Sequence, residues 1–224
     1  MAGETVKSEA VCLAIRPWSQ TSHVVSWLTP QGKVGTVVRG AVRPKSFFLG
    51  QYDLNYTCEI LYYGRARGDL HALRDCAPLE RRDGLRADYR ALALAGYFRR
   101  LASDYAPAGP DCAAWYARLS GALDGLAARA PAASLVHRLL RFEIDVLHLL
   151  GLSPEIEADA GRFRLRGERT IPVSAEVAAY LRNPVPNEKN VRVPLDAARV
   201  IGVFYHFHLD CAADVRRAVL ALIS

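Results

Sequence analysis

The chain has 224 residues, of which 51% are hydrophobic and 23% charged. This composition is typical of a folded globular protein with one large core or two smaller ones, and it excludes a disordered chain. The opening MAGETVKSEA contains no apolar signal segment, and no apolar run approaches the ~18 residues that cross a bilayer. We therefore expect a soluble, cytoplasmic protein that does not contact a membrane.

Positive charge is concentrated in residues 10–52. The formal net charge of the chain is +6, and this stretch holds five basic residues and no Asp or Glu. Such a concentration favours nucleic acid as a partner, because basic side chains that neutralise phosphates release counterions. A solvated basic loop without a ligand is the alternative. The cations predicted to bind DNA are Arg16, Lys33, Arg39, Arg43 and Lys45.

Residues 1–80 show the alternating pattern of β-strands, and Gln31-Gly32 marks a hairpin turn. The expected strands cover residues 11–16, 24–28, a segment from 34, 54–62 and 70–76. Five short strands, with a loop between the third and the fourth, predict a five-stranded β-barrel of the OB type. Residues 1–80 are therefore expected to form an OB-fold domain.

Residues 81–224 are predicted to form an α-helical domain, which makes the fold class α+β. Apolar residues recur there at helical spacing, Gly151 is placed to end one helix and Ser174 to begin another. The expected helices cover residues 85–101, 111–126, 131–150, 174–182, 194–207 and 212–223. Residues 161–172 are polar and irregular, and a hairpin is one interpretation of them.

No residue pattern indicates a metal site, a cofactor or an enzyme. His206 and His208 are two residues apart, and on a helix such residues point in different directions and cannot share one ion. The sequence has no phosphate-binding GxxxxGK loop and no nucleophile elbow. The five cysteines form no CxxC pair and are expected to be reduced and mostly buried. They are Cys12, Cys58, Cys76, Cys112 and Cys211.

Aromatic residues interleave with the basic ones, and stacking of a base on an exposed ring contributes ~1–3 kcal/mol. Trp27 alternates with inward-facing residues, so we expect it in the core. Trp18, expected in the first inter-strand loop, and Phe47, in the basic loop, could stack on bases or pack internally. Arg65 and Arg67 precede the fifth strand and are a second predicted DNA contact.

The third predicted helix carries Arg138 and Arg141 opposite most of its leucines. A solvated surface is the ordinary interpretation of such a face. The functional alternative is a groove whose arginines bind the carboxylates of an acidic peptide with an apolar end.

Three segments together resemble the RecO family of bacterial recombination mediators and DNA repair proteins. RPWSQTSH (residues 16–23), followed by TPQGKVGTVVRGAVRPKSFFLG (residues 29–50), is similar to the N-terminal domain of that family. HRLLRFEIDVLHLLGLSP (residues 137–154) resembles its helical domain, and PLDAARVIGVFYHFHL (residues 194–209) is similar in placement to its C-terminal helix.

This resemblance implies an OB fold followed by a helical domain, and no bond-breaking catalysis. RecO-like proteins bind single- and double-stranded DNA in the nucleoid and anneal strands, including strands coated by single-strand binding protein. Their helical domain receives the C-terminal tail of that protein, here through Arg138 and Arg141. With RecR, and in some systems RecF, they help to load RecA.

Two features depart from the family pattern. Many members carry a four-cysteine zinc site, whereas residues 155–170 contain no cysteine, so zinc is not expected. The basic C-terminal end is also altered, which puts a DNA contact by Arg216 and Arg217 in doubt. An OB-fold RNA-binding factor and a protein-only adaptor of the repair machinery therefore remain as alternatives.

Overall fold

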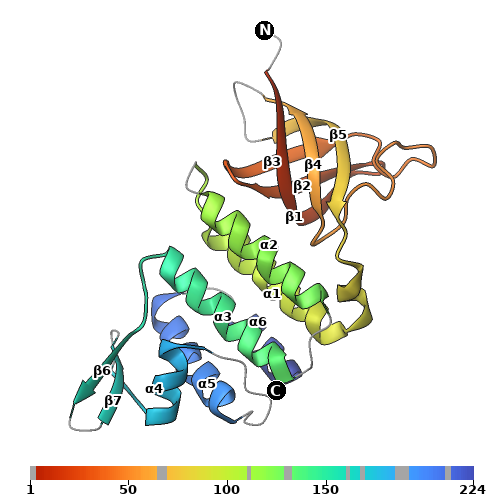
Figure 1. Cartoon of the computed structure of the whole chain (residues 1–224). Helices are drawn as coiled ribbons and strands as arrows, with labels where there is room; N and C mark the ends of the chain where they lie inside the picture. The colour runs from red at the N-terminus through yellow and green to blue at the C-terminus, as the bar shows by residue number, and fades with distance from the viewer. Residues whose placement is uncertain are drawn as a thin grey trace. The chain divides into compact units, whose positions relative to one another are not determined.

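The computed structural model describes residues 4–64, 70–109, 112–128, 133–159, 162–166, 170–184, 192–209 and 213–224. Strands come first along the chain, and helices with one small sheet follow (Figure 1). The chain divides into a barrel unit, Met1–Asp83 with Arg99–Asp124, and a helical unit, Gly84–Phe98 with Gly125–Ser224. The predicted domain boundary at residue 80 stays a prediction. None of the described helices is long and apolar enough to cross a membrane.

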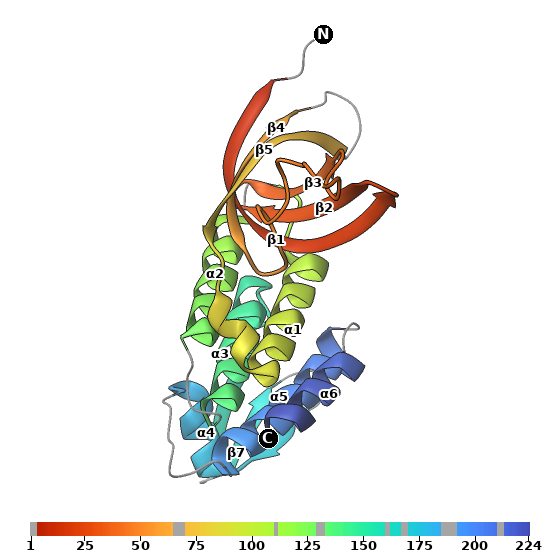
Figure 2. The same cartoon turned by 90° about the vertical axis from the view of Figure 1, so that its right-hand side faces the viewer.

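The barrel is closed in the strand order β1-β2-β3-β5-β4, which confirms the predicted five-stranded OB barrel (Figure 2). Its strands are β1 (Thr5–Ser19), β2 (Ser22–Thr29), β3 (Gly32–Val38), β4 (Thr57–Tyr63) and β5 (Leu70–Glu80). Neighbouring strands are antiparallel except β3 and β5, which pair in parallel. That parallel pair closes the barrel.

Several strand boundaries differ from those predicted, among them the start of β1 at Thr5 and the end of β5 at Glu80. β1 continues to Ser19, because register shifts between Cys12 and Ala14 and between Pro17 and Ser19 let it bend while it stays paired with β2. Trp18 therefore lies in a strand, and its predicted placement in a loop is wrong. β4 begins at Thr57 rather than near residue 54, because Asn55, with φ of 70°, turns the chain just before it.

The interior of the barrel is apolar and holds several thiols. Trp27 is fully buried, as predicted, and its Nε1 donates a hydrogen bond to Thr36 Oγ1 at 2.8 Å. Burial raises the pKa of the Cys12 thiol well above its usual range. The expected burial of reduced cysteines is confirmed at four positions, and Cys211 lies outside the described residues. The four are Cys12, Cys58, Cys76 and Cys112.

The helices agree with those predicted to within a few residues. Gly151, with φ of 72°, follows α3, and the Oγ of Ser174 accepts a hydrogen bond from the backbone N–H of Val177 at 3.2 Å at the start of α4. Asp111, where the second helix was expected to begin, lies outside the described residues. The elements are η1 (Asp83–Ala87), α1 (Tyr89–Tyr105), α2 (Ala113–Ala127), α3 (Ala133–Leu149), α4 (Ala175–Arg182), α5 (Arg192–His208) and α6 (Ala213–Ile223).

A three-stranded antiparallel sheet stands where the sequence suggested a hairpin. It consists of β6 (Glu155–Asp159), β7 (Arg162–Arg166) and β8 (Ile171–Val173). Acidic positions of β6 face basic positions of β7, with Glu157 opposite Arg164. Opposite charges across two strands stabilise such a pair. Among the described residues, no group of three or more potential metal ligands occurs.

A buried ion pair lies at the centre of the helical unit. Nε and Nη2 of Arg216 donate to the two carboxylate oxygens of Glu143 at 2.7 and 2.8 Å. The side chains are 7% and 0% exposed. The hydroxyl of Tyr97 donates to Glu143 Oε1, and burial followed by the Glu143 charge raises the pKa of that phenol well above its usual value. Arg216 is therefore a core residue of this unit and is not accessible to DNA.

Candidate nucleic-acid interface

A pocket of about 640 Å³ lies at the end of the barrel where β1 and β3 terminate. One wall comes from the turn between β1 and β2, another from the chain after β3, and the floor from the parallel pair of β3 and β5. This position corresponds to the strands and loops that OB folds use for ligands. The lining residues are Trp18, Ser19, Ser22, Val37, Arg39, Gly40, Arg43, Leu70 and Ala72.

The turn after β3 contributes Arg39 and Arg43 to the lining of the pocket. Gly40 has a φ of 66°, and the backbone N–H of Arg43 donates to the Gly40 carbonyl at 3.2 Å. The Gly40 N–H in turn donates to Ser22 Oγ at 3.3 Å. Because Ser22 begins β2, the turn is tied to the barrel. The backbone that carries Arg39 and Arg43 is therefore held in place, and both side chains line the pocket.

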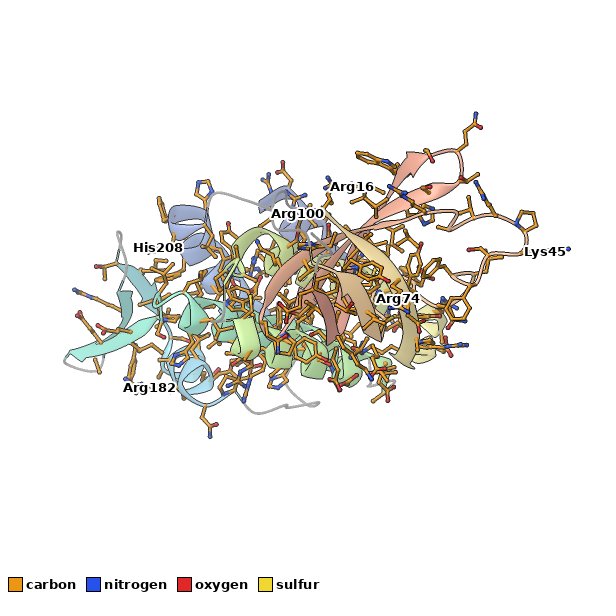
Figure 3. The ribbon with its side chains drawn as sticks, turned by 90° about the horizontal axis from the view of Figure 1, so that it is seen from above. Arg16, Lys45, Arg74, Arg100, Arg182 and His208 are labelled. Atoms are coloured by element: carbon orange, nitrogen blue, oxygen red, sulfur yellow. The ribbon has the colours of Figure 1, made fainter. Side chains whose placement is uncertain are left out.

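Four of the predicted DNA contacts are exposed cations without acidic partners in the described part of the chain: Arg16, Arg39, Arg43 and Lys45. Arg16 lies on β1, opposite Val24, and Lys45 lies at the outer end of the loop after β3 (Figure 3). Some other exposed cations of the barrel unit are paired, such as Lys7 with Glu59 at 3.0 Å. The unpaired cations leave a positive potential at this end.

Lys33 is not part of this group, although the sequence placed it in the same basic stretch. It lies near the start of β3, whereas Arg39 follows the end of that strand, about 20 Å away at ~3.3 Å per residue. Its Nζ donates to the carbonyl oxygen of Ser103 at 3.0 Å. The DNA contact predicted for Lys33 stays a prediction, and its ammonium already has a partner inside the protein.

Phe47 lies in the basic loop but does not line the pocket. Its ring is 65% exposed and meets the ring of Phe48 edge-on, with centroids 5.8 Å apart, while Phe48 packs against the barrel core. The structure thus leaves Phe47 accessible for stacking. Arg65 and Arg67, the second predicted contact, lie outside the described residues.

The two arginines of α3 differ in their surroundings. Arg141 is exposed, whereas Arg138 is half-buried with its guanidinium against Gly125, and burial lowers the pKa of Arg138. Nδ1 of His137, on the same helix, lies 2.7 Å from the hydroxyl of Tyr180 on α4. Burial, followed by the charges of Arg141 and Arg138, lowers the pKa of His137. This face of the helical unit is basic and partly apolar.

Sequence reasoning missed the floor of the pocket. Val37 and Ala72 become neighbours only through the parallel pairing of β3 and β5, and Leu70 lies two residues before Ala72, at the start of β5. These residues look like ordinary strand positions in the sequence. The one signal that could have found them was the OB pattern itself, which places the fifth strand beside the third.

The sequence matches two protein-family models. Residues 1–82 match the description "Recombination protein O N terminal", and residues 86–223 match "Recombination protein O C terminal". The boundary between the two matches falls just after β5. Together they cover nearly the whole chain in the expected order.

Several proteins named DNA repair protein RecO are similar in sequence. That of Moorella thermoacetica is 31% identical over 69% of this chain and 56% of its own length. Those of a Roseiflexus species and Geobacter metallireducens are 27% and 30% identical, over 70% and 66% of this chain and 53% and 59% of their own. The matched part thus spans little more than half the length of these relatives. On the strength of both family matches, the chain belongs to the RecO family.

Proposed function

We propose that the chain binds DNA and anneals complementary strands, as a RecO-like mediator of recombinational DNA repair. The observation that supports this most is the group of exposed cations at one end of the OB barrel, which have no acidic partners among the described residues. Its members are Arg16, Arg39, Arg43 and Lys45. The names of the relatives agree with a role in DNA repair.

The mechanism that we propose is electrostatic and requires no bond to be made or broken. Two complementary strands repel each other through their phosphates, and cations that bind both reduce this repulsion while they raise the local strand concentration. Because phosphates are common to both forms of DNA, single and double strands would bind. Guanidinium groups such as those of Arg39 and Arg43 bind phosphates in a bidentate manner.

Partner proteins belong to the same proposal. The C-terminal tail of single-strand binding protein would bind at the basic face of α3, where the exposed Arg141 and the half-buried Arg138 would contact carboxylates. RecR would be the direct partner in recombination, with RecF and RecA involved indirectly. The protein would act as a mediator rather than an enzyme.

Salt-dependent binding of a fluorescent single-stranded oligomer tests the proposal. The variant Arg39→Ala/Arg43→Ala/Lys45→Ala should bind more weakly, and the slope of log K against log salt should fall by about one for each phosphate that the variant no longer neutralises. A matched control is Lys7→Ala/Arg90→Ala/Arg100→Ala, which removes the same number of positive charges. Each of these cations is already paired with a carboxylate.

Three outcomes would count against the proposal in different ways. An equal decrease of the slope in both triple variants would mean that net charge, and not this surface, governs binding. Strong preference for structured RNA in a competition would favour an RNA-binding factor. No binding of any oligomer at low salt would favour a protein-only adaptor.

A further inference from the structure

We propose that the pocket beside Trp18 binds one unstacked nucleobase of a single DNA strand. This inference rests on the proposed function and adds the part of the strand that this end of the barrel recognises. Trp18 supplies a face for stacking, the β3–β5 pair an apolar floor, and Arg39 and Arg43 the contacts to phosphates. A base inside a duplex is stacked and paired, so only a single strand offers this ligand.

Trp18 is placed as a rigid stacking platform. Its indole is 62% exposed although it belongs to a strand, and its neighbours Pro17 and Ser19 pair with His23 and Ser22 of β2. Trp18 itself lies at the register shift between these two pairs, so its backbone is held on both sides and its ring loses little conformational freedom when a base stacks on it. The exposed indole thus contributes little to the core, but its ring is accessible to a ligand.

The lining combines apolar side chains, which suit a base, with two arginines, which suit the phosphates beside it. Val37, Leu70 and Ala72 are half-buried, and they give an apolar surface against which a base can lose water. No acidic residue lines the pocket among the residues that the structure describes. Its volume of about 640 Å³ falls within the range of about 300–1,000 Å³ that is typical of sites for small organic ligands.

Arg39 and Arg43 are the charged residues of the lining, and the backbone of a bound strand would leave the pocket beside them. Arg43 lies against Gly40, with its Cδ 3.3 Å from the position that a Cβ on that glycine would occupy. Both arginines line the pocket, so their guanidinium groups would bind the phosphates next to the inserted base. Phosphate binding and base binding are therefore separable by mutation.

Tryptophan fluorescence of the whole chain provides a direct test. Of its three tryptophans, Trp27 and Trp115 are 0% and 3% exposed, so quenching of solvent-exposed emission reports on Trp18. A short oligothymidylate should quench this emission, whereas an oligomer of the same length made of abasic nucleotides should bind through its phosphates without quenching. Trp18→Phe should abolish the quenching and keep the tighter binding of the thymidylate.

Affinity measurements give a second readout. Trp18→Ala should weaken binding of oligothymidylate by about 5- to 150-fold and leave the abasic oligomer and the salt slope unchanged. Tyr89→Ala removes an equally exposed ring, 69% exposed on α1, and should change neither affinity. Because Trp18 is exposed, the variant is expected to fold, which an unchanged melting temperature would verify.

The outcomes separate this inference from the proposed function. Equal, salt-sensitive affinity for both oligomers would overturn the base pocket and leave DNA binding in place. A greater decrease in affinity from Phe47→Ala than from Trp18→Ala would move the stacking to the outer loop and also overturn the pocket. Failure of both oligomers to bind at low salt would overturn both proposals.

Discussion

Arg82 donates a hydrogen bond from Nη1 to the backbone carbonyl of Asn55 at 2.6 Å. Both residues have a positive φ, 52° and 70°, which L-residues seldom adopt. The same guanidinium donates to Thr57 Oγ1 at 2.9 Å and to Ser120 Oγ at 2.8 Å, and its Nε pairs with Asp124 at 2.7 Å. One buried arginine therefore fixes the chain just before β4 and ties it to α2 within the barrel unit.

We expect Arg82→Ala to lower the free energy of unfolding by about 2–4 kcal/mol, because it leaves buried acceptors without donors. Urea denaturation monitored by circular dichroism measures this change in the free energy of unfolding. The control is Arg100→Ala, which breaks an exposed pair with Asp104 and should cost less than about 1 kcal/mol. Similar destabilisation in the two variants would show that the buried hydrogen bonds of Arg82 add little.

Substitution of Gly40 or Gly50 by alanine distinguishes the effect of backbone strain from the effect of displacing the Arg43 side chain. Both have a positive φ, 66° and 73°, but a Cβ on Gly40 would press on Arg43, whereas one on Gly50 would meet no atom within 4 Å. Each change to Ala should cost about 1 kcal/mol of stability. Only Gly40→Ala should weaken DNA binding, measured by fluorescence anisotropy. Equal binding defects would mean that the strain, and not the position of Arg43, matters.

The ion pair between Arg216 and Glu143 predicts a strongly non-additive pair of mutations. Arg216→Met should destabilise the helical unit by about 3–5 kcal/mol, because it leaves a buried carboxylate unpaired. The double variant Arg216→Met/Glu143→Gln should recover much of this stability, since no buried charge remains. Thermal denaturation of the single and double variants measures the coupling. Additive effects would contradict this account.

The surroundings of His137 predict that the stability of the fold depends on pH. Its pKa is lowered from the ordinary 6.5, first by burial and then by Arg141 and Arg138. The fold thus favours the neutral imidazole, so its contribution to stability is complete above about pH 6.5 and is lost as the pH falls through the lowered value. Arg141→Gln should raise the pKa of His137, which NMR titration detects. His137→Gln should flatten the stability profile below pH 6.5.

The sequence by itself determined the elements whose signals are local. Alternating apolar residues and the Gln31-Gly32 turn are enough for the hairpin of β2 and β3, because strand periodicity and turn chemistry lie within a few residues. Caps such as Ser174 and Gly151 mark helix ends for the same reason. The OB barrel followed, since five strands in about 80 residues leave few closed arrangements.

Only the tertiary structure decided which residues meet. Lys33 and Arg39 belong to one basic stretch, but an extended strand separates them, so only the second reaches the pocket. Trp18 joins Arg39 because bulges carry β1 past its predicted end. The pairs of Val37 with Ala72 and of Glu143 with Arg216 connect residues far apart along the chain. Such contacts form only when the whole fold is assembled, and no periodic pattern in the sequence predicts them.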